Sequence, residues 1–144
     1  MRKNAIRIIA LIITLMLLLS TVSFASVTAS EYINATSTWI SRDGNTVKVN
    51  FYIIGTGLMD QIGVKKVYLY ELNGNTWSLV KTFNYTNPLY ASTMMASSAS
   101  IHAGYLSYSG SASKSYYADV RFYAEKNGGS DTIQQDTPTS YGTP

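Results

Sequence analysis

The stretch Thr46-Val-Lys-Val-Asn-Phe-Tyr-Ile-Ile54 alternates between apolar and more polar side chains along most of its length. Val47, Val49, Phe51 and Ile53 share one parity, and the polar or amphipathic side chains take the other. Because successive side chains of a strand point to opposite faces, this pattern predicts a strand with one buried and one solvent-facing side. The stretch therefore favours a β fold.

Further strands and turns are predicted on both sides of this stretch. Tyr32–Ile40 reads as a strand, and the Asp-Gly within Ser41–Asn45 predicts the hairpin turn that joins the two. The other predicted strands are separated by residues typical of turns and span 64–72, 76–83, 91–95, 101–108, 116–124 and 130–134. Seven or eight short strands at this spacing predict an all-β sandwich or small barrel.

Two connections decide which side chains enter the core. Gly55–Gly63 carries three glycines and is expected to be a loop between two sheets, with Leu58, Met59 and Ile62 at the core edge. A three-residue loop at Asn73–Asn75 would place Trp77 in the core, whereas a two-residue turn would move it beside Tyr68 and Tyr70. The first alternative gathers more apolar side chains on one face and is favoured.

The chain begins with three cationic side chains, those of Arg2, Lys3 and Arg7. An apolar run, Ile8–Leu19, follows, and then small and hydroxylated residues, which is typical of a secretory signal peptide. Cleavage after Ala25 or Ala29 fits, and the start of the patterned sequence favours Ala29. The apolar run is shorter than the roughly 20 residues of a spanning helix, so an uncleaved anchor is the less favoured alternative.

The predicted signal peptide determines which domains and which cellular compartment we expect. We expect a signal peptide at 1–29, a β domain at 30–136 and a flexible C-terminal tail at 137–144, with secretion or loose cell-wall association. Removing the signal peptide lowers the number of Lys and Arg residues from 11 to 8, which equals the number of Asp and Glu residues. A neutral domain has no electrostatic reason to bind nucleic acid or anionic lipid. Because the exported chain has no Cys, it is expected to be disulfide-free.

Tyr116-Tyr-Ala-Asp-Val120 resembles the penultimate strand of immunoglobulin-like and fibronectin type III-like domains. The resemblance implies a single immunoglobulin-like β-sandwich of seven or eight short antiparallel strands. It further implies that the Tyr116 hydroxyl turns back onto the backbone and that Ala118 is buried.

The wider pattern is similar to a group of small exported proteins of clostridial Gram-positive bacteria that have no known activity. The residues that carry this similarity are Gly55–Gly63, Tyr70-Glu71, Trp77, His102, Tyr116–Ala124 and Gly128–Asp131. The resemblance implies export and a sandwich fold in a bacterial protein.

No catalytic or metal-binding pattern stands out in the sequence. His102 is the only His, and no serine lies in a Gly-x-Ser-x-Gly motif, so a structural hydrogen bond is the favoured role of His102. The carboxylates are dispersed and lack a calcium-loop spacing; Asp60 or Asp131 is a minor calcium candidate. We therefore expect no enzyme, no cofactor and no metal, with a hydrolase as a remote alternative.

Tyrosines are the most prominent candidates for binding residues in the predicted domain. If strand 64–72 lies beside strand 116–124, one sheet face gathers the candidate binding residues Tyr68, Tyr70, Tyr117, Arg121 and Tyr123. Such a face can stack on sugars or anchor a protein, and ordinary cross-strand pairing of tyrosines is the alternative. The sequence predicts a secreted module that binds protein or glycan at the cell surface. A secreted effector or bacteriocin-like toxin is the alternative function.

Overall fold

The structure, a computed structural model, describes residues 30–143, and the predicted signal peptide 1–29 lies outside them. The elements in chain order are β1 (Ile33–Asp43), β2 (Thr46–Asn73), β3 (Thr76–Asn84), α2 (Ala91–Met94), β4 (Met95–Ser109), β5 (Tyr116–Lys126) and β6 (Gly129–Asp136). The predicted all-β class is confirmed. None of the helices within the described residues is long and apolar enough to span a membrane.

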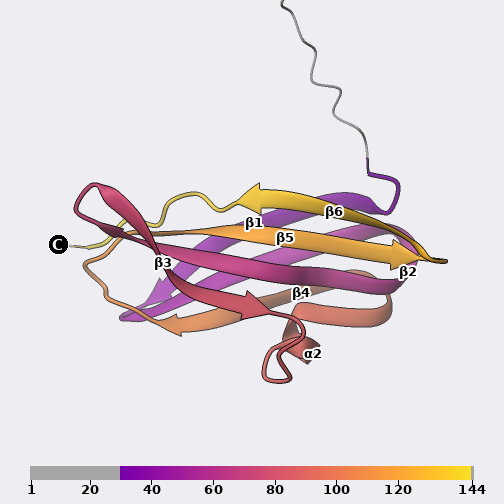
Figure 1. Ribbon diagram of the computed structural model, residues 1–144, viewed down its shortest axis with the longest axis horizontal. Coiled ribbons are helices and arrows are strands. Elements are labelled where there is room, and N and C mark those ends of the chain that lie inside the picture. Colours follow the sequence, from indigo (N-terminus) through magenta and orange to yellow (C-terminus); the bar gives the residue numbers. More distant parts are fainter. Residues whose placement is uncertain (1–29, 144) are drawn as a thin grey trace, which may run out of the picture.

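Strand β2 is the axis of the fold. It is 28 residues long and pairs antiparallel with four other strands. Its first half pairs with β1 and β4, and its second half pairs mainly with β3 and β5, while β6 extends the sheet beyond β5. Figure 1 shows β1 (indigo) passing behind β5 and β6, and the three strands are in contact. The sheet is therefore curled around a single interior.

The predicted loop at Gly55–Gly63 is wrong, because β2 runs through it and joins two predicted strands into one. Its ladder with β4 is interrupted where residues 55–58 oppose only Ser100. Extra residues on one strand bend it and increase its twist, which lets β2 serve both halves of the curled sheet. Met59 and Ile62 are buried as predicted, whereas Leu58 is exposed.

The core confirms the alternation that predicted β2. Val47, Val49, Phe51 and Ile53 are all buried and face the interior. The rest of the core comes from the remainder of β2, from β5 and from single side chains of β1, β3, β4 and α2. These residues are Ile33, Met59, Ile62, Val64, Val67, Leu69, Phe83, Met94, Leu106, Tyr116, Ala118, Val120, Phe122 and Ala124. Burial of this apolar cluster is the main source of stability, since the chain has no Cys.

The segment before β4 forms a helical turn, so the short strand predicted at 91–95 is wrong. The side chains of Asn84 and Asn87 each accept a hydrogen bond from a backbone N–H two residues later, which favours turns over a strand. Helix α2 places Met94 in the core. The Nε2 of His102 lies 2.8 Å from the backbone oxygen of Thr93, which confirms the predicted structural hydrogen bond.

Tyr116 makes the backbone contact that the resemblance implies. It is fully buried, and its hydroxyl accepts a hydrogen bond of 2.9 Å from the backbone N–H of Ser111. The same hydroxyl donates a hydrogen bond of 2.6 Å to the carboxylate of Glu71. Burial and the bond to Glu71 raise the pKa of Tyr116 to about 12. Ala118 is buried as expected.

The C-terminal segment, where the sequence predicts a flexible tail at 137–144, makes hydrogen bonds along β5 within the residues that the structure describes. Thr137 exchanges hydrogen bonds with the backbone of Ala118, and Ser140 does so with Tyr116. Because β6 ends at Asp136, these groups of β5 would otherwise lie unpaired at the sheet edge. The tail therefore continues the pairing that β6 begins.

Arg42 stabilises the end of the molecule where the β4–β5 loop lies against the C-terminal segment. Its guanidinium lies over the ring of Tyr116, with Cζ 5.1 Å from the centroid. It donates hydrogen bonds to four backbone oxygens, those of Ser111, Ala112, Lys114 and Tyr141. One side chain thus ties β1 to the β4–β5 loop and to the C-terminal segment.

Candidate binding surface

The register of β2 and β5 brings most of the predicted binding residues together. Tyr70 pairs with Tyr117, and Tyr68 pairs with Asp119, which confirms that segment 64–72 lies beside segment 116–124. The buried neighbours Val67, Leu69, Ala118 and Val120 have the opposite parity. The tyrosines therefore lie on the outer side of this half of the sheet. We call the outward residues Tyr68, Tyr70, Trp77, Tyr117, Asp119 and Arg121 the tyrosine face.

Three rings form the aromatic part of the tyrosine face. Tyr70 and Tyr117 stack with ring centroids 4.8 Å apart and an interplanar angle of 7°. Trp77 meets Tyr117 edge-on, with centroids 4.8 Å apart and an angle of 90°. Burial of the Tyr117 phenol raises its pKa, because the charged form loses hydration. Electrostatic interactions with Tyr70, Asp136 and Asp119 raise the pKa of Tyr117 further. The cluster is a half-buried, mutually braced aromatic surface.

Trp77 belongs to this face, so the favoured placement of Trp77 in the core is wrong. Asn73 pairs with Thr76, which leaves a two-residue turn and sets Trp77 opposite Leu72. Farther along the same hairpin, Tyr70 pairs with Leu79 but Leu69 pairs with Lys81, so Val80 is an extra residue. This bulge reverses the parity of β3, and Phe83 enters the core while Trp77 stays outside.

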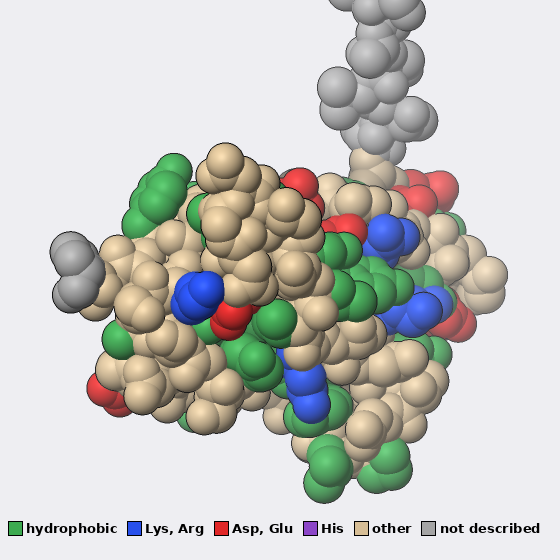
Figure 2. All heavy atoms as spheres, turned by 60° about the vertical axis from the view of Figure 1, so that its left-hand side comes forward, with side chains coloured by type: hydrophobic (Ala, Val, Ile, Leu, Met, Phe, Trp, Pro, Cys, Tyr) green, Lys and Arg blue, Asp and Glu red, His purple; other side chains and the backbone are tan. Residues whose placement is uncertain are grey.

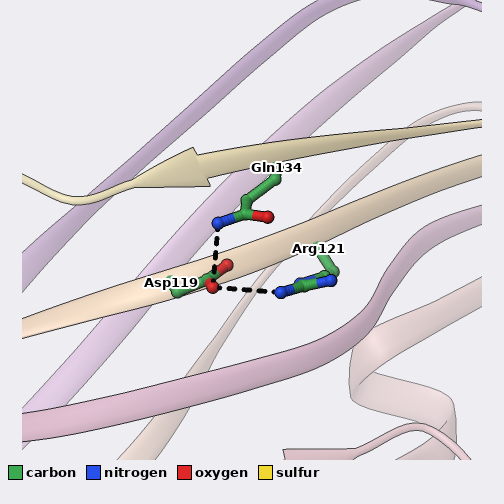
Figure 3. A network of polar contacts seen from close by, with 3 residues as sticks. All are labelled: Asp119, Arg121 and Gln134. Carbon is green, nitrogen blue, oxygen red and sulfur yellow. Dashed lines mark hydrogen bonds and ion pairs between the residues drawn. The ribbon is translucent and has the colours of Figure 1, made fainter.

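A polar network adjoins the rings (Figure 3). An oxygen of the Asp119 carboxylate lies 3.4 Å from the Arg121 guanidinium and accepts a hydrogen bond of 3.1 Å from the Gln134 amide. Arg121 also lies over Tyr68, with Cζ 5.6 Å from the ring centroid. The Asp119 side chain is 13% exposed and that of Arg121 is 42% exposed. The network therefore orients a cation that reaches solvent, although an ion pair this exposed contributes only about 0–1 kcal/mol to stability.

Tyr123 is separate from this cluster, although the sequence placed it on the same face. It is only 7% exposed, and the Lys65 ammonium lies 3.4 Å from its ring centroid. Its hydroxyl donates to the carboxylate of Glu125. Val64 pairs with Phe122 and Lys66 with Arg121, so Lys65 is an extra residue whose side chain covers the ring. Tyr68, Tyr70, Tyr117 and Arg121 remain as the predicted binding residues that the structure brings together.

The two carboxylates considered for calcium serve loop hydrogen bonds. Asp60 accepts from the backbone N–H of Asn127. Asp131 accepts from the hydroxyl of Ser30 and from the N–H of Tyr32, and these bonds lower the pKa of Asp131. Within residues 30–143 there is no group of three or more His, Asp or Glu side chains that could hold a metal ion, and no pocket.

Charged side chains are few on the side of the molecule that Figure 2 shows, and the two signs are interspersed among polar groups. This distribution agrees with the equal numbers of acidic and basic residues after position 29. The surface can thus offer aromatic and polar contacts, with no large field of one sign in this view.

Comparison with known proteins adds a distant structural likeness. No protein-family model matches the chain, and no curated protein matches it. The chain is similar to the crystal structure of Spo0M, a sporulation control protein from Bacillus subtilis, with 8% identity and a TM-score of 0.42. The match covers 74% of this chain and 48% of Spo0M, so the chain spans about half the length of that protein. A likeness of this size carries no argument about function.

Proposed function

We propose that this chain is an exported, non-enzymatic binding domain that holds a protein partner on the tyrosine face. The pattern of residues 1–29 supports export. The observation that carries the binding proposal is the joint presence of Trp77, Tyr70, Tyr117 and Arg121 on one regular sheet. Trp, Tyr and Arg are the residues that dominate the energetics of protein interfaces.

An immunoglobulin-like sandwich is the architecture we propose for this domain. The pairing of β2 supports it, because its first half joins β1 and β4 while its second half joins β3, β5 and, through β5, β6. Two groups of strands that share one bent strand suit two facing layers. The buried Tyr116, with its hydroxyl on the backbone of Ser111, is a second supporting feature.

The state of the rings favours a protein over a glycan on this face. Tyr70 and Tyr117 each cover one face of the other, and Trp77 packs edge-on against Tyr117, so part of the ring surface on which a sugar would stack is already occupied. A braced cluster loses little side-chain entropy when a partner binds, which favours affinity. Arg121, held by Asp119 and Tyr68, adds an oriented charged donor for a carboxylate or backbone carbonyl.

A photocrosslinking experiment tests this proposal. A photoreactive residue in place of Gln134, which is exposed beside Arg121, is expected to capture a defined surface protein of the producing cell. With that protein purified, Arg121→Ala should raise Kd by about 30-fold, as for a hot-spot residue worth about 2 kcal/mol. Ser130→Ala, at an exposed position of β6, is the matched control and should leave Kd unchanged.

Two results would contradict the proposal. The first is a Kd for the captured protein that Arg121→Ala and Tyr68→Ala both leave unchanged while the variants remain folded. The second is crosslinking at position 134 to polysaccharide alone, which would show that the tyrosine face binds a glycan and not a protein.

A further inference from the structure

The outer side of the other half of the sheet also carries exposed aromatic residues. Trp39 of β1 is 46% exposed and Tyr105 of β4 is 55% exposed. Both pair with Asn50 of β2, so the three residues form one row across three strands. Tyr52 lies on the central strand two residues farther along and faces the same way. We call Trp39, Asn50, Tyr52 and Tyr105 the tryptophan face.

Small side chains surround the two exposed rings. Ser37 and Ser41 are the outward neighbours of Trp39 on β1, and Ala103 and Ser107 are those of Tyr105 on β4. The rings therefore rise above the residues beside them on the same strand. Since they are two strand spacings apart, their Cα atoms are separated by about 10 Å. In contrast to the braced rings of the tyrosine face, Trp39 makes no aromatic ring contact within residues 30–143.

Polar groups lie between the rings. The side-chain amide nitrogen of Asn50 lies within 3.3 Å of the backbone oxygen of Trp39 and donates hydrogen bonds to the Ser41 hydroxyl and to the backbone oxygen of Lys48, which fixes its orientation. The ammonium of Lys48 lies 5.4 Å from the ring centroid of Tyr105. Among the outward positions of these three strand segments, Lys48 and Asp43 are the charged ones, and their charges cancel.

We infer that the tryptophan face binds an uncharged polysaccharide chain. The C–H groups on one side of a sugar ring pack against the negative face of an aromatic ring, and the sugar hydroxyls bond to amide and hydroxyl groups. A small ligand is usually held in a concave pocket. Two exposed rings on the outer side of the curled sheet instead suit a polymer that lies across the strands and reaches both. Because the charges on the face cancel, a charged polymer would gain no net attraction there, whereas binding of an uncharged polymer does not depend on such attraction. This inference does not depend on protein binding at the tyrosine face.

Binding to polysaccharides of known charge tests the inference. The purified chain is sedimented with insoluble cellulose or chitin and run in native gels that contain soluble β-glucan or polygalacturonate. We expect retention by at least one uncharged polymer, equal at low and high salt because no ion pairs are involved. Trp39→Ala and Tyr105→Ala should each raise Kd by at least about tenfold, whereas Trp39→Tyr should keep most of the binding.

A spectroscopic readout places the ligand on the ring itself. The chain has 2 Trp residues, so Trp77→Phe leaves Trp39 as the sole fluorophore of this kind. The soluble polymer should shift the Trp39 emission to shorter wavelength, because stacking removes water from an exposed indole. Arg121→Ala, on the tyrosine face, is the control that should leave polysaccharide binding unchanged, so the two faces are tested separately.

The inference fails if the unmodified chain binds none of the uncharged polymers, or if only polygalacturonate retains it. It also fails if folded Trp39→Ala binds as well as the unmodified chain. If sedimentation shows a dimer that Trp39→Ala dissociates, the face belongs to a second copy of the chain and the inference is overturned.

Discussion

The buried phenol of Tyr116 on β5 donates a hydrogen bond of 2.6 Å to the carboxylate of Glu71, its paired residue on β2. The same oxygen accepts from the backbone N–H of Ser111. One hydroxyl thus connects the central strand, its neighbour and the loop before β5. Gly110 lies against it, since a Cβ atom at that position would be 2.6 Å from the phenol oxygen.

Removal of this hydroxyl should lower stability. Tyr116→Phe keeps the ring but leaves Glu71 and the Ser111 N–H without their partner, so we expect a loss of about 1–3 kcal/mol in the free energy of unfolding. Urea denaturation measures it. Tyr105→Phe, at an exposed phenol, should change stability by less than about 0.5 kcal/mol. Equal effects of the two substitutions would contradict the role assigned to the Tyr116 hydroxyl.

The same residue predicts a change of stability in alkali. The pKa of Tyr116 is raised in the folded state to about 12 from a reference value of 10.0, so the folded chain holds its proton more tightly than the unfolded chain. This contribution is complete below pH 10 and is lost as the pH rises from about 10 to about 12. Urea midpoints across that range should fall more steeply for the unmodified chain than for Tyr116→Phe. Parallel curves would show that Tyr116 is not the group responsible.

Arg42 should hold the C-terminal segment in place. Arg42→Ala removes its four hydrogen bonds to backbone oxygens and its contact with the Tyr116 ring. We expect a loss of at least about 1.5–3 kcal/mol, the range for one hydrogen bond to a charged group, and faster proteolysis after Thr137. Arg42→Lys, which cannot reproduce the planar fork of donors, should restore little. Unchanged amide exchange at Ser140 and Thr143 would contradict this assignment.

Gly63 should not tolerate a side chain. A Cβ atom there would overlap the backbone oxygen of Met94, where α2 meets β4. Gly63→Ala should therefore destabilise the chain by about 1–3 kcal/mol, as overpacking does, and thermal unfolding measures it. Gly57→Ala is the matched control, because a Cβ atom there meets only the Lys126 ammonium at 3.8 Å. A neutral Gly63→Ala would show that the two backbones can move apart.

Much of the candidate site could be predicted, because most of its residues lie on two paired strands along which the side chains alternate between faces. Alternation in 64–72 and 116–124 placed Tyr68, Tyr70 and Tyr117 on one face, and the register confirms this. Trp77 was misplaced because one extra residue of its own strand, Val80, shifts the pairing of β3. Tyr123 was misplaced because an extra residue of the neighbouring strand β2, Lys65, covers its ring. The tryptophan face was overlooked because Trp39 and Tyr105 are far apart in the chain and meet only through Asn50.

Alternation and turn residues alone predict the all-β class, the first hairpin and the buried parity of Val47, Val49, Phe51 and Ile53, and the structure confirms all three. These features are local, since side chains alternate with a period of two along any strand. Three other features depend on how the strands pair in space: β2 runs unbroken past Gly55, the C-terminal segment lies along β5, and the bulges fall at particular residues. A bulge or an edge pairing depends on which other strand lies alongside, and alternation within one segment contains no information about that neighbour.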